Sequence, residues 1–259
     1  MKRIIIAFSA AALAMTSCSI LQNLDSDYLL DGGAKVVQAM TLSDAEIQAY
    51  VAQYVAAYDA ENTVLPASNA YVKRLNALCG RLTEVDGVPL NFKVYKTNDV
   101  NAFACADGSV RVYTGLMDLM DDEELLGVIG HEIGHVALKH TKKDMQNALL
   151  RSAALSGLAS TGETMAQLSQ SDLAAIGETI MSAKFSRKQE TEADNFSYAF
   201  LKAAGYNPIC IRNSLVKLQS LEGDASSLAG VNQLFSSHPS TDKRIANIEK
   251  QLKADGYIQ

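Results

Sequence analysis

Two histidines and a glutamate form the pattern in this sequence that predicts chemistry most directly. His131 and His135 are four residues apart, and Glu132 follows the first of them, in the stretch His-Glu-Ile-Gly-His. Apolar residues recur at helical spacing over residues 123–139, and residues four apart on a helix share one face. Two neutral imidazoles and one further ligand make a Zn2+ site that keeps one position for water, and Glu132 could accept a proton from that water. We therefore expect one zinc ion per chain in a hydrolytic site.

The third metal ligand is expected on a second helix. No further histidine follows at the spacing that other zinc proteases use. His140 lies five residues after His135, about 500° round a continuous helix, and should point away from the metal. Glu190 and Asp194 are four residues apart. One of these carboxylates can bind the metal while the other accepts a hydrogen bond from a liganding imidazole.

Capping patterns set the limits of the predicted helices. Ser43 with Glu46 and Asp121 with Glu124 are capping boxes, and Gly205 is expected to end a helix. We expect helices over residues 41–59, 68–82, 121–139, 182–204, 208–221 and 242–252, and further helices separated by a loop within 144–182.

Strand signals are confined to one region between the early and the late helices. Leu90, Phe92 and Val94 alternate with polar residues. Two apolar runs, 101–105 and 110–114, flank an Asp-Gly pair, which is typical of a hairpin. Helices, then strands, then helices indicate an α+β fold, here a mostly helical domain with a small antiparallel β-sheet.

Four motifs follow one another along the chain: residues 101–104 with 112–116, residues 131–135, residues 186–194 (Ser-Arg-Lys-Gln-Glu-Thr-Glu-Ala-Asp), and Ser237-His238-Pro239 with Arg244-Ile245. In this order they resemble the motifs of the HtpX and CAAX-prenyl-protease family of gluzincin zinc metallopeptidases. The resemblance extends from about Tyr71 to the end of the chain. Cys105-Ala106 departs from the apolar-Pro continuation usual in the family. The chain looks most like the periplasmic LoiP/BepA-like lipoprotein branch, without the tetratricopeptide tail of BepA-like proteins.

The resemblance implies roles for the matched residues around the metal. The implied zinc ligands are His131, His135 and Glu190, the implied general base is Glu132, and Asp194 is implied to orient a liganding imidazole.

The resemblance also implies a strand that binds the substrate backbone. It consists of Asn101, Ala102, Phe103 and Ala104. An exposed strand edge can add an extended peptide through main-chain hydrogen bonds, with loose sequence preference. The alternative is that this hairpin is only a structural edge.

Two residues near the C-terminus are candidates for a catalytic role. A tetrahedral oxyanion needs a hydrogen-bond donor, which His238 or Arg244 could supply. His238-Pro239 could instead be only a turn, and Arg244 only a surface charge. A further possibility is that His238 occupies the fourth metal position at rest and leaves it when substrate arrives.

The first residues are typical of an export signal. Lys2 and Arg3 precede a short apolar run over residues 4–15, and Thr16-Ser17 lead to Cys18. The segment resembles a bacterial lipobox, although Met15 stands where leucine is usual. We divide the chain into a lipoprotein signal peptide (1–17), a lipidated N-terminus and tether (18–40) and a zinc metallopeptidase domain (41–259). The alternative is ordinary signal cleavage nearby, which would leave a soluble periplasmic protein.

Three cysteines remain after Cys18, namely Cys79, Cys105 and Cys210. An odd number allows at most one internal disulfide. The alternative is three buried, unpaired thiols.

These features together predict a zinc-dependent endopeptidase on the periplasmic side of the bacterial cell envelope. It would be held by a lipid to a membrane, with the outer membrane favoured, and would degrade unfolded or misfolded envelope proteins. A chaperone or scaffold for outer-membrane proteins with a structural zinc site is one alternative, against which the intact Glu132 argues, and a hydrolase of another bond is a second. A net charge of −6 without a basic stripe argues against nucleic-acid binding.

Lipidation at Cys18 is the first testable prediction. Mass spectrometry of the mature protein should find an N-terminal peptide that begins at Cys18 and carries acyl chains. An unacylated N-terminus elsewhere would contradict the lipobox and favour a soluble periplasmic enzyme.

Overall fold

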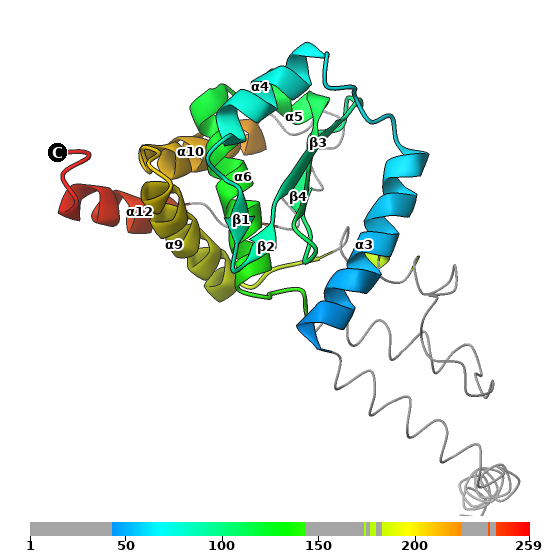
Figure 1. The fold of residues 1–259 in the computed structure, drawn as a ribbon. Helices are drawn as coiled ribbons and strands as arrows, with labels where there is room; N and C mark the ends of the chain where they lie inside the picture. Colours follow the sequence, from blue (N-terminus) through cyan, green and yellow to red (C-terminus); the bar gives the residue numbers. More distant parts are fainter. Residues whose placement is uncertain (1–42, 143–173, 175–176, 180–182, 224–237, 239–241) are drawn as a thin grey trace, which may run out of the picture.

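The computed structural model describes residues 43–142, 174, 177–179, 183–223, 238 and 242–259 (Figure 1). The predicted signal peptide, Cys18 and the tether lie outside these residues, as does most of the predicted helical stretch 144–182. Among the helices that are described, none combines the length and the apolar composition that a membrane crossing requires.

The first two described helices form where they were predicted, although α3 ends two residues beyond the predicted limit of residue 59. α3 (Asp44–Glu61) begins at the predicted capping box, in which Ser43 Oγ accepts from the Glu46 N–H and the Glu46 carboxylate accepts from the Ser43 N–H. α4 (Ala70–Cys79) begins at Asn69, whose side chain accepts a hydrogen bond from the backbone of Tyr71.

A three-stranded sheet follows, with the strand order β3-β5-β4. β4 (Ala102–Ala104) and β5 (Ser109–Tyr113) form the predicted antiparallel hairpin, and β3 (Asn91–Tyr95) matches the predicted alternating strand. β3 and β5 pair in parallel, so the sheet is mixed rather than wholly antiparallel. The reason is that the chain leaves β3, forms the outer strand β4 and then turns back between the two, so that β3 and β5 run in the same direction.

A second, two-stranded sheet was not predicted. β1 (Glu84–Val85) and β2 (Val88–Pro89) pair antiparallel around Asp86 and Gly87, which have φ values of 49° and 77°. Such positive angles at both central residues are typical of a tight hairpin turn and favour an Asp-Gly pair.

Five helices complete the described chain: α5 (Thr114–Leu119), α6 (Asp122–Ala137), α9 (Arg187–Ala203), α10 (Ile209–Gly223) and α12 (Asp242–Ala254). The predicted capping box of Asp121 and Glu124 starts α6. α9 starts later than predicted because Ser186 caps it, with Gln189 completing a capping box. Gly205 follows α9 with a φ of 78°, as expected for a glycine that ends a helix.

α6 is the central helix of the domain. The sheet contacts one side of α6 through β4, while α9 and α10 pack on it from another side (Figure 1). α3 covers the opposite face of the sheet, where a second hydrophobic cluster joins its residues to side chains of all three strands. All three described cysteines are buried and unpaired, which confirms the alternative of three free thiols and not that of an internal disulfide.

A buried ion pair fixes α3 to the sheet. Arg111 on β5 is 2% exposed and donates to both carboxylate oxygens of Asp59 on α3, at 2.8 and 3.0 Å. Lys93 and Tyr95 on β3 also donate to Asp59. Burial alone would raise the pKa of Asp59, but these hydrogen bonds outweigh it and lower the pKa to about 2.

Asp59→Asn should lower the free energy of unfolding by about 3 kcal/mol, because it leaves the buried Arg111 charge without its partner. Urea denaturation of the purified protein measures this. Asp86→Asn is the matched control, since it removes the same charge from an exposed turn and should change stability by less than about 0.5 kcal/mol. Equal effects of the two variants would contradict a stabilising role for the buried pair.

The same pair predicts how stability depends on pH. Asp59 has an ordinary pKa of 3.8 and a folded pKa of about 2, so its contribution is present above about pH 4 and is lost as the pH falls towards 2. The stability difference between the parent and Asp59→Asn should therefore shrink over that window. A difference that stays constant down to pH 3 would contradict the lowered pKa.

Candidate active site

The paired histidines lie on α6, where the helix is buried between the sheet and α9. His131, Glu132 and His135 are 7%, 6% and 3% exposed. Gly134 faces α9, and a Cβ atom built on it would lie only 2.7 Å from the carbonyl oxygen of Ala193. A side chain at position 134 would therefore push α9 away and separate the histidines from the carboxylates that α9 carries.

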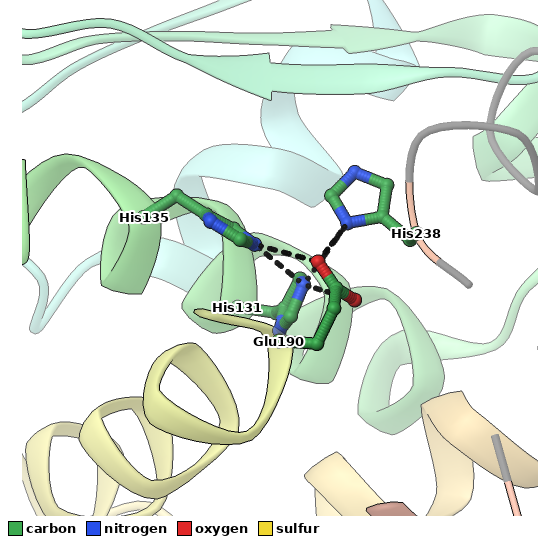
Figure 2. Close-up of side chains that lie close together, drawn as sticks. All are labelled: His131, His135, Glu190 and His238. Carbon is green, nitrogen blue, oxygen red and sulfur yellow. Dashed lines mark hydrogen bonds and ion pairs between the residues drawn. The ribbon is translucent and has the colours of Figure 1, made fainter. Parts of the chain in front are cut away.

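Four potential ligand atoms converge at one point, within 4.8 Å of one another (Figure 2). The Nε2 atoms of His131 and His135 are 3.0 Å apart, and Glu190 Oε1 lies 3.2 Å from Nε2 of His135. Nδ1 of His238 lies 3.2 Å from Nε2 of His131 and 3.1 Å from Glu190 Oε1. Ligand atoms about 2.0–2.1 Å from a tetrahedral zinc ion are about 3.3 Å from each other, so this set of three nitrogens and one oxygen fits such an ion.

The charges of the cluster suit a cation. Burial lowers the pKa of His135 to about 2, so its imidazole is neutral. Burial and Arg244 would lower the pKa of His131 as well, but hydrogen bonds with Asp194 and Glu190 outweigh them and raise it to about 9. His131 therefore carries a proton while no metal is bound. This proton would compete with a metal ion for the imidazole, so metal affinity should decrease as the pH falls below about 9.

Behind the ligands, a second carboxylate and a guanidinium hold the cluster. Asp194 Oδ1 is 2.9 Å from Nδ1 of His131, on the opposite side of the ring from the ligand atom. Arg244 on α12 donates to Asp194 through Nε at 2.7 Å and through Nη2 at 2.8 Å, and to Glu190 through Nη1. The structure thus places Asp194 where an orienting partner of a metal-ligating histidine belongs.

Arg244 is not the surface charge that one reading of the sequence allowed. It is 4% exposed, and its nitrogens face Asp194, Glu190 and His131. This position behind the ligands gives it the role of holding the two carboxylates and does not support the role of oxyanion donor. Arg244 lies four and eight residues before Ile248 and Leu252, which are fully buried, so the apolar stripe of α12 was the signal for its burial.

Glu132 and His238 lie next to each other at the cluster. Nδ1 of His238 faces the ligand atoms, and its Nε2 is 3.5 Å from Oε1 of Glu132. Burial raises the pKa of Glu132, which favours a carboxylate that must accept and return a proton. The His238 side chain is only 10% exposed, so it is more than a solvent-facing turn residue.

The predicted substrate strand is an edge strand. Within the described sheet, β4 pairs only with β5, and it packs on α6. Ala102 and Phe103 are buried, while Asn101 and Ala104 are partly buried. The geometry leaves the outer edge of β4 without a partner strand among the described residues, next to the helix that carries His131 and His135.

His140 is not one of the four ligand residues, in agreement with the prediction, but its side chain contacts the site from behind instead of pointing away from it. Nδ1 of His140 lies 2.9 Å from Nδ1 of His135. The prediction assumed a helix that continues through residue 140, whereas α6 ends at Ala137 and Lys139 turns the chain back with a φ of 55°. Phe185, which the sequence did not single out, stacks on the ring of His135 with ring centroids 3.7 Å apart.

Known proteins resemble this chain over nearly its full length. Residues 66–252 match the model of peptidase family M48. The metalloprotease LoiP of Escherichia coli (strain K12) is 42% identical over 98% of both chains, and the metalloprotease YcaL of the same organism is 38% identical over 96% of this chain and 97% of that one. A beta-barrel assembly-enhancing protease of Yersinia pestis is 26% identical over 87% of this chain and 46% of its own length.

Glu190→Ala should lower the bound metal per chain, because it removes the one carboxylate in the ligand cluster. Glu192→Ala is the matched control, since Glu192 is two residues away and its side chain is 43% exposed. Elemental analysis after dialysis against stoichiometric zinc measures both. Equal loss in the two variants, or loss only at Glu192, would show that the wrong carboxylate was assigned.

Proposed function

Because this chain belongs to peptidase family M48 and is a metalloprotease, we propose that it is a zinc-dependent endopeptidase of the bacterial cell envelope that degrades misfolded envelope proteins. The observation that carries the catalytic part is the convergence of His131, His135, Glu190 and His238 beside the carboxylate of Glu132. Three imidazole nitrogens and one carboxylate oxygen are donors typical of zinc, whereas magnesium and calcium prefer oxygen ligands.

Different residues of the site have different roles in the proposed peptide hydrolysis. A zinc ion held by His131, His135 and Glu190 would polarise the scissile carbonyl and acidify a water molecule. Glu132 accepts the proton of the attacking water and returns it to the leaving amine. Asp194 and Arg244 keep the ligands in place, as their hydrogen bonds to His131 and Glu190 indicate.

The outer edge of β4 has no partner strand among the described residues, which supports the proposal that the substrate is an extended, unfolded chain. A peptide added to this edge would be held mainly by main-chain hydrogen bonds, which are independent of sequence. Such binding selects chains that are already unfolded, because a folded protein rarely offers a free extended segment. We therefore propose misfolded envelope proteins as substrates, with the chain held at the membrane through a lipid on Cys18.

One observation favours a second candidate function, a chaperone or scaffold with a structural zinc site. Four protein ligands close the coordination of a zinc ion, as in structural sites, and His238 would be the fourth. The buried Glu132 favours the enzyme, because a structural site has no use for a base. We propose instead that His238 occupies the fourth position at rest and gives way to substrate.

Casein hydrolysis by the purified zinc-loaded protein tests the catalytic proposal. Cleavage should stop on addition of a chelator, and Glu132→Gln should keep zinc but lower the rate by at least about 100-fold. Glu123→Gln is the control, because Glu123 is exposed in the first turn of the same helix and is not part of the ligand cluster. Absence of cleavage by the parent would favour the scaffold or a hydrolase of another bond. Substantial activity in zinc-replete Glu132→Gln would refute the proposed base.

His238→Ala separates the two roles considered for His238. If His238 closes the metal position, its removal should raise basal proteolysis. If it stabilises the oxyanion, the same change should lower the rate about 100-fold, the usual cost of losing one such donor. Zinc content is measured on the same samples, and an unchanged rate would leave His238 with neither role.

A further inference from the structure

His140 contacts the ring of a metal ligand on the side away from the metal position. Nε2 of His135 belongs to the ligand cluster, and the other ring nitrogen, Nδ1, lies 2.9 Å from Nδ1 of His140. The His140 side chain is 7% exposed, so water cannot readily replace it in this contact.

The end of α6 holds His140 in this position. The N–H of His140 donates to the carbonyl of His135, and the N–H of Lys139 donates to the carbonyl of Val136. Together with the left-handed conformation of Lys139, these bonds form a Schellman motif, which usually places glycine at that position. The backbone and the side chain of His140 therefore both contact His135, and their relative position is fixed by the helix end.

We propose that His140 is a positioning residue for His135. Nδ1 of His140 accepts a hydrogen bond from the Nδ1–H of His135, so that the lone pair on Nε2 of His135 faces the metal position. A neutral imidazole carries its proton on only one ring nitrogen. If Nδ1 of His135 donates to His140, then Nε2 has no proton and is free to bind a cation. The inference rests on the zinc site of the proposed function.

The second ring nitrogen of His140 completes this arrangement. With Nδ1 accepting from His135, the proton of neutral His140 lies on Nε2. That atom is 3.6 Å from the exposed Glu192 carboxylate on α9, which agrees with this tautomer but is too far for a hydrogen bond, so the arrangement does not depend on Glu192. His131 has the equivalent partner in Asp194 at 2.9 Å. Both ligating histidines of α6 would thus be oriented from behind, one by a carboxylate directly and one through a second imidazole.

The alternative is that His140 only ends the helix and fills space. The variants His140→Asn and His140→Leu distinguish the two. Both side chains branch at Cγ, but only asparagine keeps an acceptor atom at the place of Nδ1. The readouts are zinc affinity, from competition with a chromophoric chelator, and the unfolding temperature of the metal-free full-length protein.

We expect His140→Leu to weaken zinc binding about 10- to 100-fold, the usual effect of losing such a partner. His140→Asn should bind zinc as tightly as the parent, and the metal-free leucine variant should unfold at the temperature of the metal-free parent. If His140→Leu does not fold, His140→Phe, which keeps a flat ring without an acceptor, replaces it.

Parental zinc affinity in the apolar variant would overturn the inference. Equal weakening in the apolar and asparagine variants would also overturn it, because the acceptor atom would then not matter. A parent that binds zinc but cleaves no protein would refute the proposed function and leave this inference standing. A parent that binds no zinc would refute both.

Discussion

Arg244 donates hydrogen bonds to Glu190 and Asp194, two carboxylates that are fully buried. Two buried negative charges would repel each other and would cost several kcal/mol to remove from water. One guanidinium from α12 and a proton or metal at the histidines offset them. The site therefore requires that α6, α9 and α12 pack together, and the small residues between α6 and α9, Gly134 and Ala193, permit that approach. The neutralisation of charge in the cluster therefore depends on the packing of these three helices.

The sequence predicted the parts of the site that depend on local spacing. The His-Glu-x-x-His spacing and the capping boxes of Ser43 and Asp121 all act within a single helix, and the structure places these elements as expected. The role of Arg244 depends on how α12 docks against α9, which spacing alone does not specify. The contact of His140 with His135 was not predicted, because Lys139, and not a glycine, adopts the positive φ that ends α6. The parallel pairing of β3 with β5 follows from which strand takes the outer edge, and this too is decided by tertiary packing.

A site with four convergent donors and an adjacent base has two demands that conflict. Tight metal binding favours a closed set of ligands, whereas catalysis needs one position for the substrate and for water. His238 could meet both demands by occupying the fourth position only at rest. One of its ring nitrogens faces the ligand atoms and the other faces Glu132. Closing the position at rest would limit proteolysis of intact proteins, which suits an enzyme proposed to act on unfolded chains.

The central claim is that one zinc ion binds at the point where α6 and α9 meet. Anomalous diffraction at the zinc absorption edge, from crystals of the full-length protein, tests it most directly. We expect one peak per chain, about 2.0–2.1 Å from Nε2 of His131, Nε2 of His135 and a carboxylate oxygen of Glu190. A peak coordinated by other residues, or no peak in a preparation that cleaves protein, would contradict it.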